Sequence, residues 1–454
     1  MHQGPPAKAK RRMGSAFLGS WLPVSLVLGS LAVRGEDSVD TQAALRELRQ
    51  QNELLQRTLR DQQGQIEQLN RTVSELKQAS RNGGEAADQN VTHQTDAFAG
   101  LKLGKVILSG EGGVAMFRTG TRGAFPNSEF RIDEAKLFLD AQITESIFVF
   151  TELNLVTREA PDENLHLGEL YLDFDNILEG LGWDKALSLR AGRIDIPFGE
   201  EYLSRNAVDN PLISHSLSDL WGYDEGVEAH GSLRGVRYAL AVQNGGNSLL
   251  RDYNADKSVT GRVGYEATPW LNLSASGMRT GKLDSKNDNL SALWFGNGFL
   301  KTLGTASTTT FHANLAEGDA RVRLGKGYLK VAGGWIGYDD DDPRGNNSRD
   351  VYYHYVEAMQ PLPARFYAVA RFSQVFAPGG FPVVGSAVAG PYFKPVLTPD
   401  LLTTDMFRIS LGVGYKLTQK LALKTEYALD RGHKVDGTKR DHEDFFAIEA
   451  VGGF

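Results

Sequence analysis

Alternation of apolar and polar residues runs through most of the chain, from about residue 101 to 454 of its 454 residues, and it limits the possible folds more than any other feature. In Ala135–Ile143, Val236–Val242 and Leu421–Leu429 apolar side chains occupy every second position, and mostly polar, charged or small side chains fall between them. A period of two is that of a β-strand with two different faces. About ten residues is also the length of a tilted strand that crosses a membrane. We therefore predict an all-β fold of antiparallel strands.

Short and long connections alternate between these strands. Short turns on one side and longer polar loops on the other are typical of outer-membrane β-barrels. We count sixteen strands, or eighteen if Leu290–Leu315 adds a further pair instead of forming one long loop. The short turns are expected at 144–145, 233–235, 268–269, 324–326, 362–364 and 418–419, and the long ones at 119–128, 157–165, 195–221, 244–257, 339–349, 376–403 and 431–443.

The chain ends in an alternating segment, Phe445–Phe454, whose last residue is aromatic. Such an ending resembles the C-terminal strand signal of outer-membrane proteins, which implies contact between the Phe454 strand and the barrel-assembly machinery. A soluble secreted β-sandwich or β-propeller is the alternative. A propeller would need an internal repeat of blade length, and we find none.

The N-terminal residues 1–35 have the pattern of a secretory signal peptide. Basic residues between Lys8 and Arg12 precede the uncharged stretch Ala16–Val33, and small residues follow near Gly35. A membrane anchor is the alternative reading. No later apolar run is long enough to span a bilayer as a helix, so a membrane role for the remainder requires a closed barrel.

Residues 41–78 carry an unbroken heptad pattern, which predicts a coiled coil that associates with other copies of the chain. Polar residues at two seam positions, Asn52 and Gln62, would fix the alignment of the helices. A single amphipathic helix packed on its own domain is the alternative. Residues 79–100 are polar and contain glycine, as in a flexible linker. The seam consists of Leu45, Leu48, Asn52, Leu55, Leu59, Gln62, Ile66, Leu69, Val73 and Leu76.

If the apolar positions of the strands face lipid, the opposite positions line the interior. Acidic residues dominate the first wall of this interior, and basic residues dominate the stretch from Arg237 to Arg408. These charges could form opposed walls with a transverse field, or they could solvate the interior and pair with neighbouring strands. The predicted pore-lining residues are Arg190, Arg237, Arg262, Arg321, Arg323, Lys330, Arg371, Arg408, Glu134, Asp140, Glu152, Glu169 and Asp173.

The long connection Asp195–Trp221 is the candidate constriction loop. It carries charges at Glu200, Glu201, Arg205 and Asp209, and its apolar residues need burial, which suits a loop folded into the barrel. Packing on the rim or against a neighbouring subunit is the alternative.

Composition and motifs exclude several functions. Cysteine is absent, so thiolate zinc sites and cysteine catalysis are excluded. The net charge of -7 gives no support for a nucleic-acid partner. We find no metalloprotease, serine-hydrolase or phosphate-loop motif. Asp339–Asp342 could bind calcium or form a solvated turn, and its spacing matches no known calcium loop. We therefore expect no catalytic residues, no metal and no cofactor.

Two segments carry a family resemblance. Arg190–Gly199, with Arg-x-Gly followed by Pro-Phe-Gly, and Asp224–Gly245 resemble consecutive segments of the phosphate-selective porin O and P family. This resemblance implies a sixteen-stranded trimeric barrel that conducts small anions, with a third loop folded inward and a pore lined by arginines and lysines. The predicted interior of this chain mixes both signs.

We therefore expect an outer-membrane porin, not an enzyme, for passive diffusion of small polar solutes and ions, with anions such as phosphate among the candidates. It would lie in the lipid of a Gram-negative-type outer membrane as a homotrimer. Its coiled coil would extend into the periplasm, where it could touch peptidoglycan. The alternatives are a structural tether between outer membrane and cell wall, and a barrel enzyme.

Overall fold

The computed structural model describes the part of the chain that follows residue 100. The expected signal peptide (1–35), coiled coil (41–78) and linker (79–100) lie outside the described residues, all of which belong to the second of two units, Gln89–Phe454. The described ranges are 101–103, 105–123, 125–156, 165–220, 222–245, 255–284, 308–341, 347–383 and 402–454. Within these ranges, no helix has the length and apolar character needed to cross a membrane.

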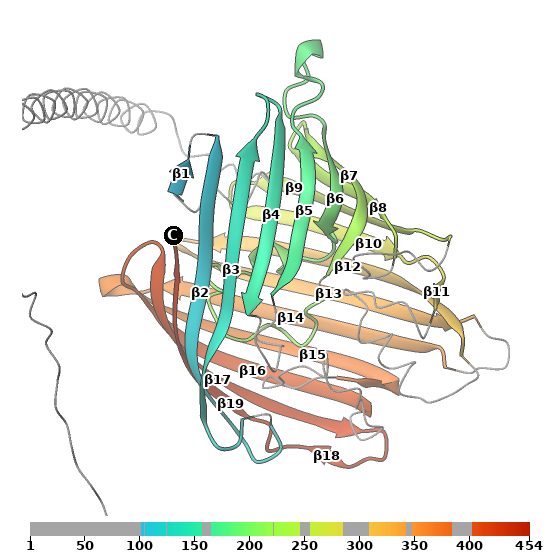
Figure 1. Cartoon of the computed structure of the whole chain (residues 1–454). Coiled ribbons are helices and arrows are strands. Elements are labelled where there is room, and N and C mark those ends of the chain that lie inside the picture. The colour runs from blue at the N-terminus through green and yellow to red at the C-terminus, as the bar shows by residue number, and fades with distance from the viewer. Residues whose placement is uncertain are drawn as a thin grey trace, which may run out of the picture. The chain divides into compact units, whose positions relative to one another are not determined.

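Sixteen long antiparallel strands form one sheet in the described residues, and the sheet closes into a barrel (Figure 1). Each strand pairs with its neighbours in chain order. The strands are β2 (Val106–Thr119), β3 (Glu129–Gln142), β4 (Ile147–Val156), β5 (His166–Phe174), β6 (Ser188–Asp195), β7 (Tyr223–Leu233), β8 (Val236–Gln243), β9 (Ser258–Thr268), β10 (Leu271–Arg279), β12 (Thr310–Leu324), β13 (Gly327–Asp340), β14 (Arg349–Pro361), β15 (Phe366–Pro382), β16 (Leu402–Lys416), β17 (Leu421–Lys434) and β19 (Phe445–Gly453).

Closure joins the last strand to the first long one. β19 pairs with β2 from Phe445 opposite Thr119 to Gly453 opposite Glu111. The backbone groups of a closed barrel bond to one another, which leaves no open sheet edge for lipid to meet. Three short strands, β1 (Leu101–Leu103), β11 (Leu283–Asp284) and β18 (Lys439–Arg440), pair with β2, β12 and β17.

The pairing of β10 with β12 decides between sixteen and eighteen strands. β10 pairs directly with β12 over nine consecutive positions, from Leu271 opposite Val322 to Arg279 opposite Asn314. A further pair of strands from Leu290–Leu315 would have to lie between β10 and β12, so the eighteen-strand alternative is wrong. The predicted sixteen-stranded barrel is confirmed.

Alternation gives each wall an apolar outer face and a polar inner face. On β16, Ile409 and Leu411 are exposed on the outside, whereas Arg408 and Ser410, which alternate with them, are buried. Phe130 on β3 is 81 % exposed, which would be costly in water and suits an acyl-chain environment. The exposed apolar side chains therefore form the lipid-facing belt.

Turn chemistry explains the tight hairpins. Arg234 and Gly235 join β7 to β8 with φ of 53° and 82°, the left-handed pair that a two-residue hairpin requires. One connection on the short-turn side is longer than expected, because β5 and β6 are joined through the 3₁₀ turn Glu179–Leu181. Strands also extend into two expected loops: β15 continues to Pro382 and β17 to Lys434.

Candidate functional site

The connection between β6 and β7, residues 196–222 and here called the inner loop, lies inside the barrel. It contains a 3₁₀ turn at Glu201–Ser204. Ile196 and Phe198 pack against side chains of β10, β12 and β13, Leu212 packs against β15, and Ile213 packs against β2 and β19. Each such burial stabilises by about 2 kcal/mol. Because these contacts reach opposite parts of the wall, the loop crosses the interior and does not rest on the rim.

Carboxylates on the wall hold the backbone of the inner loop. Glu426 on β17 accepts hydrogen bonds from the N–H groups of Ile213 and Ser214, both at 2.7 Å. Glu317 on β12 accepts from the N–H of Glu200 at 2.8 Å. A loop without regular structure leaves its backbone N–H groups unsatisfied, and these carboxylates supply the missing acceptors.

Cationic side chains on the wall hold the carbonyl groups of the same loop. Arg371 on β15 donates to the carbonyl oxygen of Ser214 at 2.9 Å and to the side-chain oxygen of Asn210 at 3.2 Å. Arg408 on β16 donates to the carbonyl oxygen of His215 at 2.9 Å. Hydrogen bonds from charged donors are stronger than neutral ones, so the segment around residue 214 is fixed from both sides.

Most of the predicted basic pore-lining residues form ion pairs with carboxylates on the wall or the loop. These pairs bring opposite charges together within single stretches of wall, which weakens a field across the interior. At these positions the charges pair with nearby side chains, which is the alternative to two opposed walls of opposite charge. The pairs are Arg190 with Asp173 (3.0 Å), Arg262 with Asp319 (2.9 Å), Lys330 with Glu200 (3.7 Å), Arg408 with Asp430 (2.8 Å), and Arg371 with Glu357.

Three predicted arginines have other surroundings. Arg237 is half-buried on the inner face of β8. Arg321 on β12 lies with its guanidinium carbon 4.8 Å from the ring centre of Tyr328, a cation–π contact. Arg323 is exposed, near the short turn that follows β12.

The predicted acidic residues of the first wall are buried on β3, β4 and β5. Glu152 accepts a hydrogen bond from the hydroxyl of Tyr223 at 2.8 Å, and Glu169 accepts one from the N–H of Asp195 at 3.0 Å. The two contacts hold the two ends of the inner loop, because Asp195 is the last residue of β6 and Tyr223 is the first residue of β7. The buried acids are Glu134, Asp140, Glu152, Glu169 and Asp173.

The four charges predicted for the constriction loop all lie on the inner loop. Glu200 and Glu201 are buried. Arg205 donates to Asp219 at 2.7 Å. Asp209 is exposed. The four charges of the loop therefore differ in their access to solvent.

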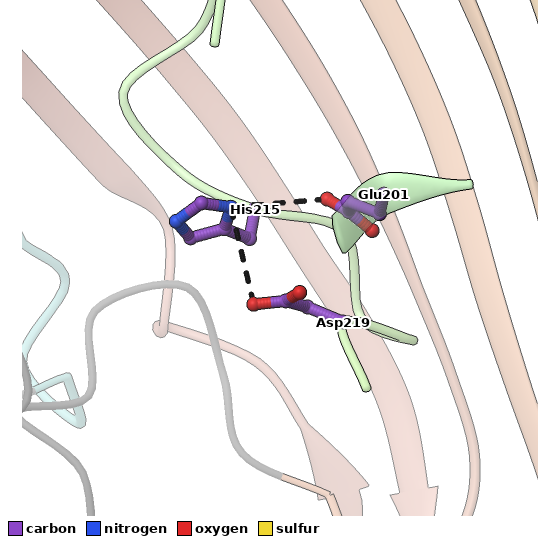
Figure 2. Close-up of side chains that lie close together, drawn as sticks. All are labelled: Glu201, His215 and Asp219. Atoms are coloured by element: carbon purple, nitrogen blue, oxygen red, sulfur yellow. Dashed lines mark ion pairs between the residues drawn. The ribbon is translucent and has the colours of Figure 1, made fainter. Parts of the chain in front are cut away.

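A further cluster on the inner loop was absent from the prediction. His215 lies between the carboxylates of Glu201 and Asp219, with its Nδ1 3.9 Å from an oxygen of each (Figure 2). The spacing of His215 and Asp219, four residues apart, is a signal that a search for metal ligands could have used. Glu201, however, lies fourteen positions earlier and joins them only through the fold.

Other missed residues follow the alternation rule. Glu317 and Asp319 share the inner face of β12 with Arg321, and Asp430 shares that of β17 with Glu426. Strict application of the period of two would have found them.

The acidic segment considered for calcium contacts a histidine. Asp339 and Asp341 lie 3.2 and 2.9 Å from the ring nitrogens of His312 on β12. Residues 342–346 are outside the described ranges. Contact with an imidazole fits a surface turn better than a calcium loop, which uses oxygen ligands.

Comparison with solved structures identifies the fold. OmpT, an outer membrane protein of Vibrio cholerae, is 12 % identical with a TM-score of 0.51, covering 79 % of this chain and 100 % of that one. A trimer form of OmpT is 12 % identical with a TM-score of 0.50, and the match covers 77 % of this chain and 99 % of that one. The outer membrane channel DcaP of Acinetobacter baumannii is 12 % identical with a TM-score of 0.50, and the match covers 79 % of this chain and 100 % of that one. No family model matches the chain, and no curated protein matches its sequence. The chain therefore has the fold of these outer-membrane β-barrels.

Proposed function

We propose that this protein is an outer-membrane porin, through which small polar solutes and ions diffuse passively. The observation that supports this most is the anchoring of the inner loop. Glu426, Glu317, Arg371 and Arg408 hold its backbone from four different strands. A charged loop that is fixed across a charged interior narrows a water-filled passage, and it does not block that passage with apolar side chains.

Weak selectivity fits the interior better than dedicated phosphate transport. An anion-selective ladder needs cationic groups whose charge is available to the solute. Arg262 lies 2.9 Å from both Asp319 and Glu200, and Arg408 lies 2.8 Å from Asp430. Because such pairing lowers the local potential, we propose a general channel for small polar solutes, with phosphate as one permeant among several.

We also propose that the porin is a homotrimer in outer-membrane lipid, with residues 41–78 as a periplasmic stalk that touches peptidoglycan. The trimer form of OmpT supports the first part by analogy of fold. Recognition of the Phe454 strand by the barrel-assembly machinery is supported by the place of this residue at the closure. Its N–H donates to the carbonyl oxygen of Gly110 on β2 at 3.0 Å.

Conductance of the full chain in planar bilayers tests this function. The porin proposal expects steady open-channel steps in potassium chloride, with substeps in groups of three for a trimer. Folded protein that gives no steps but sediments with peptidoglycan would favour the tether. Folded protein that gives no steps but hydrolyses lipid esters would favour a barrel enzyme.

A further inference from the structure

We propose that Glu201, His215 and Asp219 form a binding site for a divalent transition-metal ion of the Zn²⁺ type on the inner loop. The three side chains come from one connection and meet inside the barrel (Figure 2). This proposal stands on the positions of the donor atoms and does not depend on transport through the barrel.

The donor atoms are close enough to share one ion. One ligand atom from each of the three side chains lies within 4.8 Å of the other two. The His215 Nδ1 is 3.9 Å from Glu201 Oε1 and 3.9 Å from Asp219 Oδ2. These separations are too long for a hydrogen bond, which needs about 2.7–3.2 Å. They suit atoms that face a common centre.

The chemistry of the donors selects the ion. Zn²⁺ binds imidazole nitrogen at about 2.0–2.1 Å and carboxylate oxygen at about 2.0–2.2 Å, so two of its ligands lie roughly 3–3.5 Å apart. The three donors lie within 4.8 Å of one another, so their side chains would have to rotate towards a common ion to reach this spacing. Calcium and magnesium prefer sites made of oxygen alone. One nitrogen and two carboxylates therefore favour a transition metal.

Neighbouring groups orient the three ligands. Glu201 accepts hydrogen bonds from the N–H of Ser216 at 2.7 Å and from its hydroxyl. Arg205 donates to Asp219 Oδ2, the oxygen that lies 3.9 Å from His215 Nδ1, at 2.7 Å. The backbone carbonyl of His215 is held by a wall arginine, as described above. Such second contacts keep ligands in place and contribute to affinity for the metal.

The charge around the cluster sets an upper limit on affinity. Two carboxylates favour a dication, but Arg205 on Asp219 and Arg371, 3.8 Å from Glu201, share the same carboxylates. The ion must compete with these guanidinium groups. Three protein ligands also leave at least one position for water or a solute, as in open zinc sites.

A bound ion would tie the two parts of the inner loop together. Glu201 precedes the segment held by Glu426, and Asp219 follows it. One ion bound at both ends would restrict the motion of the loop.

Calorimetric titration of the full chain in detergent with ZnCl₂ tests the site, and the absorption of Co²⁺ tests the same ligands. Saturable binding of one ion per chain is expected. His215→Gln and Asp219→Asn should each weaken it about tenfold or more, whereas Ca²⁺ and Mg²⁺ should not compete. His433→Gln is the matched control, because His433 also faces a carboxylate, that of Asp405 at 3.1 Å, outside the cluster.

Heat-modifiable migration in gel electrophoresis verifies that each variant retains a folded barrel. Absence of Zn²⁺ binding by the folded wild type overturns the proposal, as does binding by folded His215→Gln equal to that of the wild type. Both readouts are measured without a membrane, so failure of the channel function leaves them intact, and failure of the metal site leaves conductance intact.

Discussion

The carboxylate of Glu426 on β17 accepts the backbone N–H of Ser214, 212 residues earlier in the chain, at 2.7 Å. The same oxygen accepts the N–H of Ile213 at 2.7 Å. One wall side chain thus fixes the middle of the inner loop, and the proposed passage depends on that attachment.

Replacement of Glu426 by Gln should loosen the loop. The amide lacks the charge and one of the two acceptor oxygens, so at least one loop contact weakens by about 1–3 kcal/mol. We expect faster hydrogen exchange at Ile213 and Ser214 and noisier open-channel current. Glu266→Gln, an exposed position on β9, is the control. Equal exchange in Glu426→Gln and wild type would contradict the anchoring role.

Removal of Arg371 should destabilise the barrel. It leaves Glu357 and Glu201 buried without their cationic partner, a change that costs about 3–5 kcal/mol. Urea unfolding in detergent measures the loss. Arg323→Ala, which removes an exposed arginine, should change stability by less than about 0.5 kcal/mol. Similar losses in the two variants would show that burial of the pair does not matter.

Replacement of Glu200 by Gln should shift ion selectivity towards anions. Glu200 lies 2.9 Å from Arg262 and 3.7 Å from Lys330. Its neutralisation leaves both cations with less compensating charge, so the local potential rises. The reversal potential in a potassium chloride gradient should move in the anion-selective direction. Glu145→Gln, at an exposed position in the turn between β3 and β4, is the control. No movement in Glu200→Gln beyond that of this control would argue that these charges lie away from the ion path.

Acid should weaken the hairpin that ends in β19. Burial raises the pKa of the Asp444 carboxyl, but its hydrogen bond from Arg431 outweighs this and holds the pKa below the ordinary value of 3.8. A lowered pKa in the folded state adds stability above pH 3.8 that is lost as the pH falls through the folded pKa. Because the pair is partly exposed to solvent, the gain is below about 1 kcal/mol.

The comparison of wild type with Asp444→Asn checks this account. Their melting temperatures should differ at pH 6, and the difference should shrink as the pH is lowered below 3.8 and through the folded pKa. A constant difference across this range would mean that the charge of Asp444 is not what stabilises the hairpin.

The alternation of apolar and polar residues predicts most of the fold, because successive side chains of a strand point to opposite faces of the sheet. It predicts β8 and β17 and the apolar outer belt, and it places Arg262 and Arg408 on the inner face. Alternation says nothing of the inner loop, whose inward path was expected on a separate ground, that apolar residues such as Phe198 need burial.

Contacts inside the barrel were beyond the sequence pattern. Arg262 meets Glu200, 62 residues away, and Lys424 meets the loop carbonyl of Ala207, 217 residues away. Such pairs depend on where an irregular loop crosses the interior, and no period encodes that path. The cluster at His215 was missed in part for the same reason, because Glu201 joins His215 and Asp219 only when the loop folds back.

The central claim is that solutes pass through the barrel beside the inner loop. The chain has no cysteine, so a single introduced thiol reports one position without background. Asp209→Cys places it on the exposed part of the inner loop, and Asp436→Cys places a control between β17 and β18.

A charged thiol reagent is added during single-channel recording of each variant. The account predicts stepwise reduction of current in Asp209→Cys and unchanged current in Asp436→Cys. Full modification of residue 209, verified by mass, with no change in current would contradict the account.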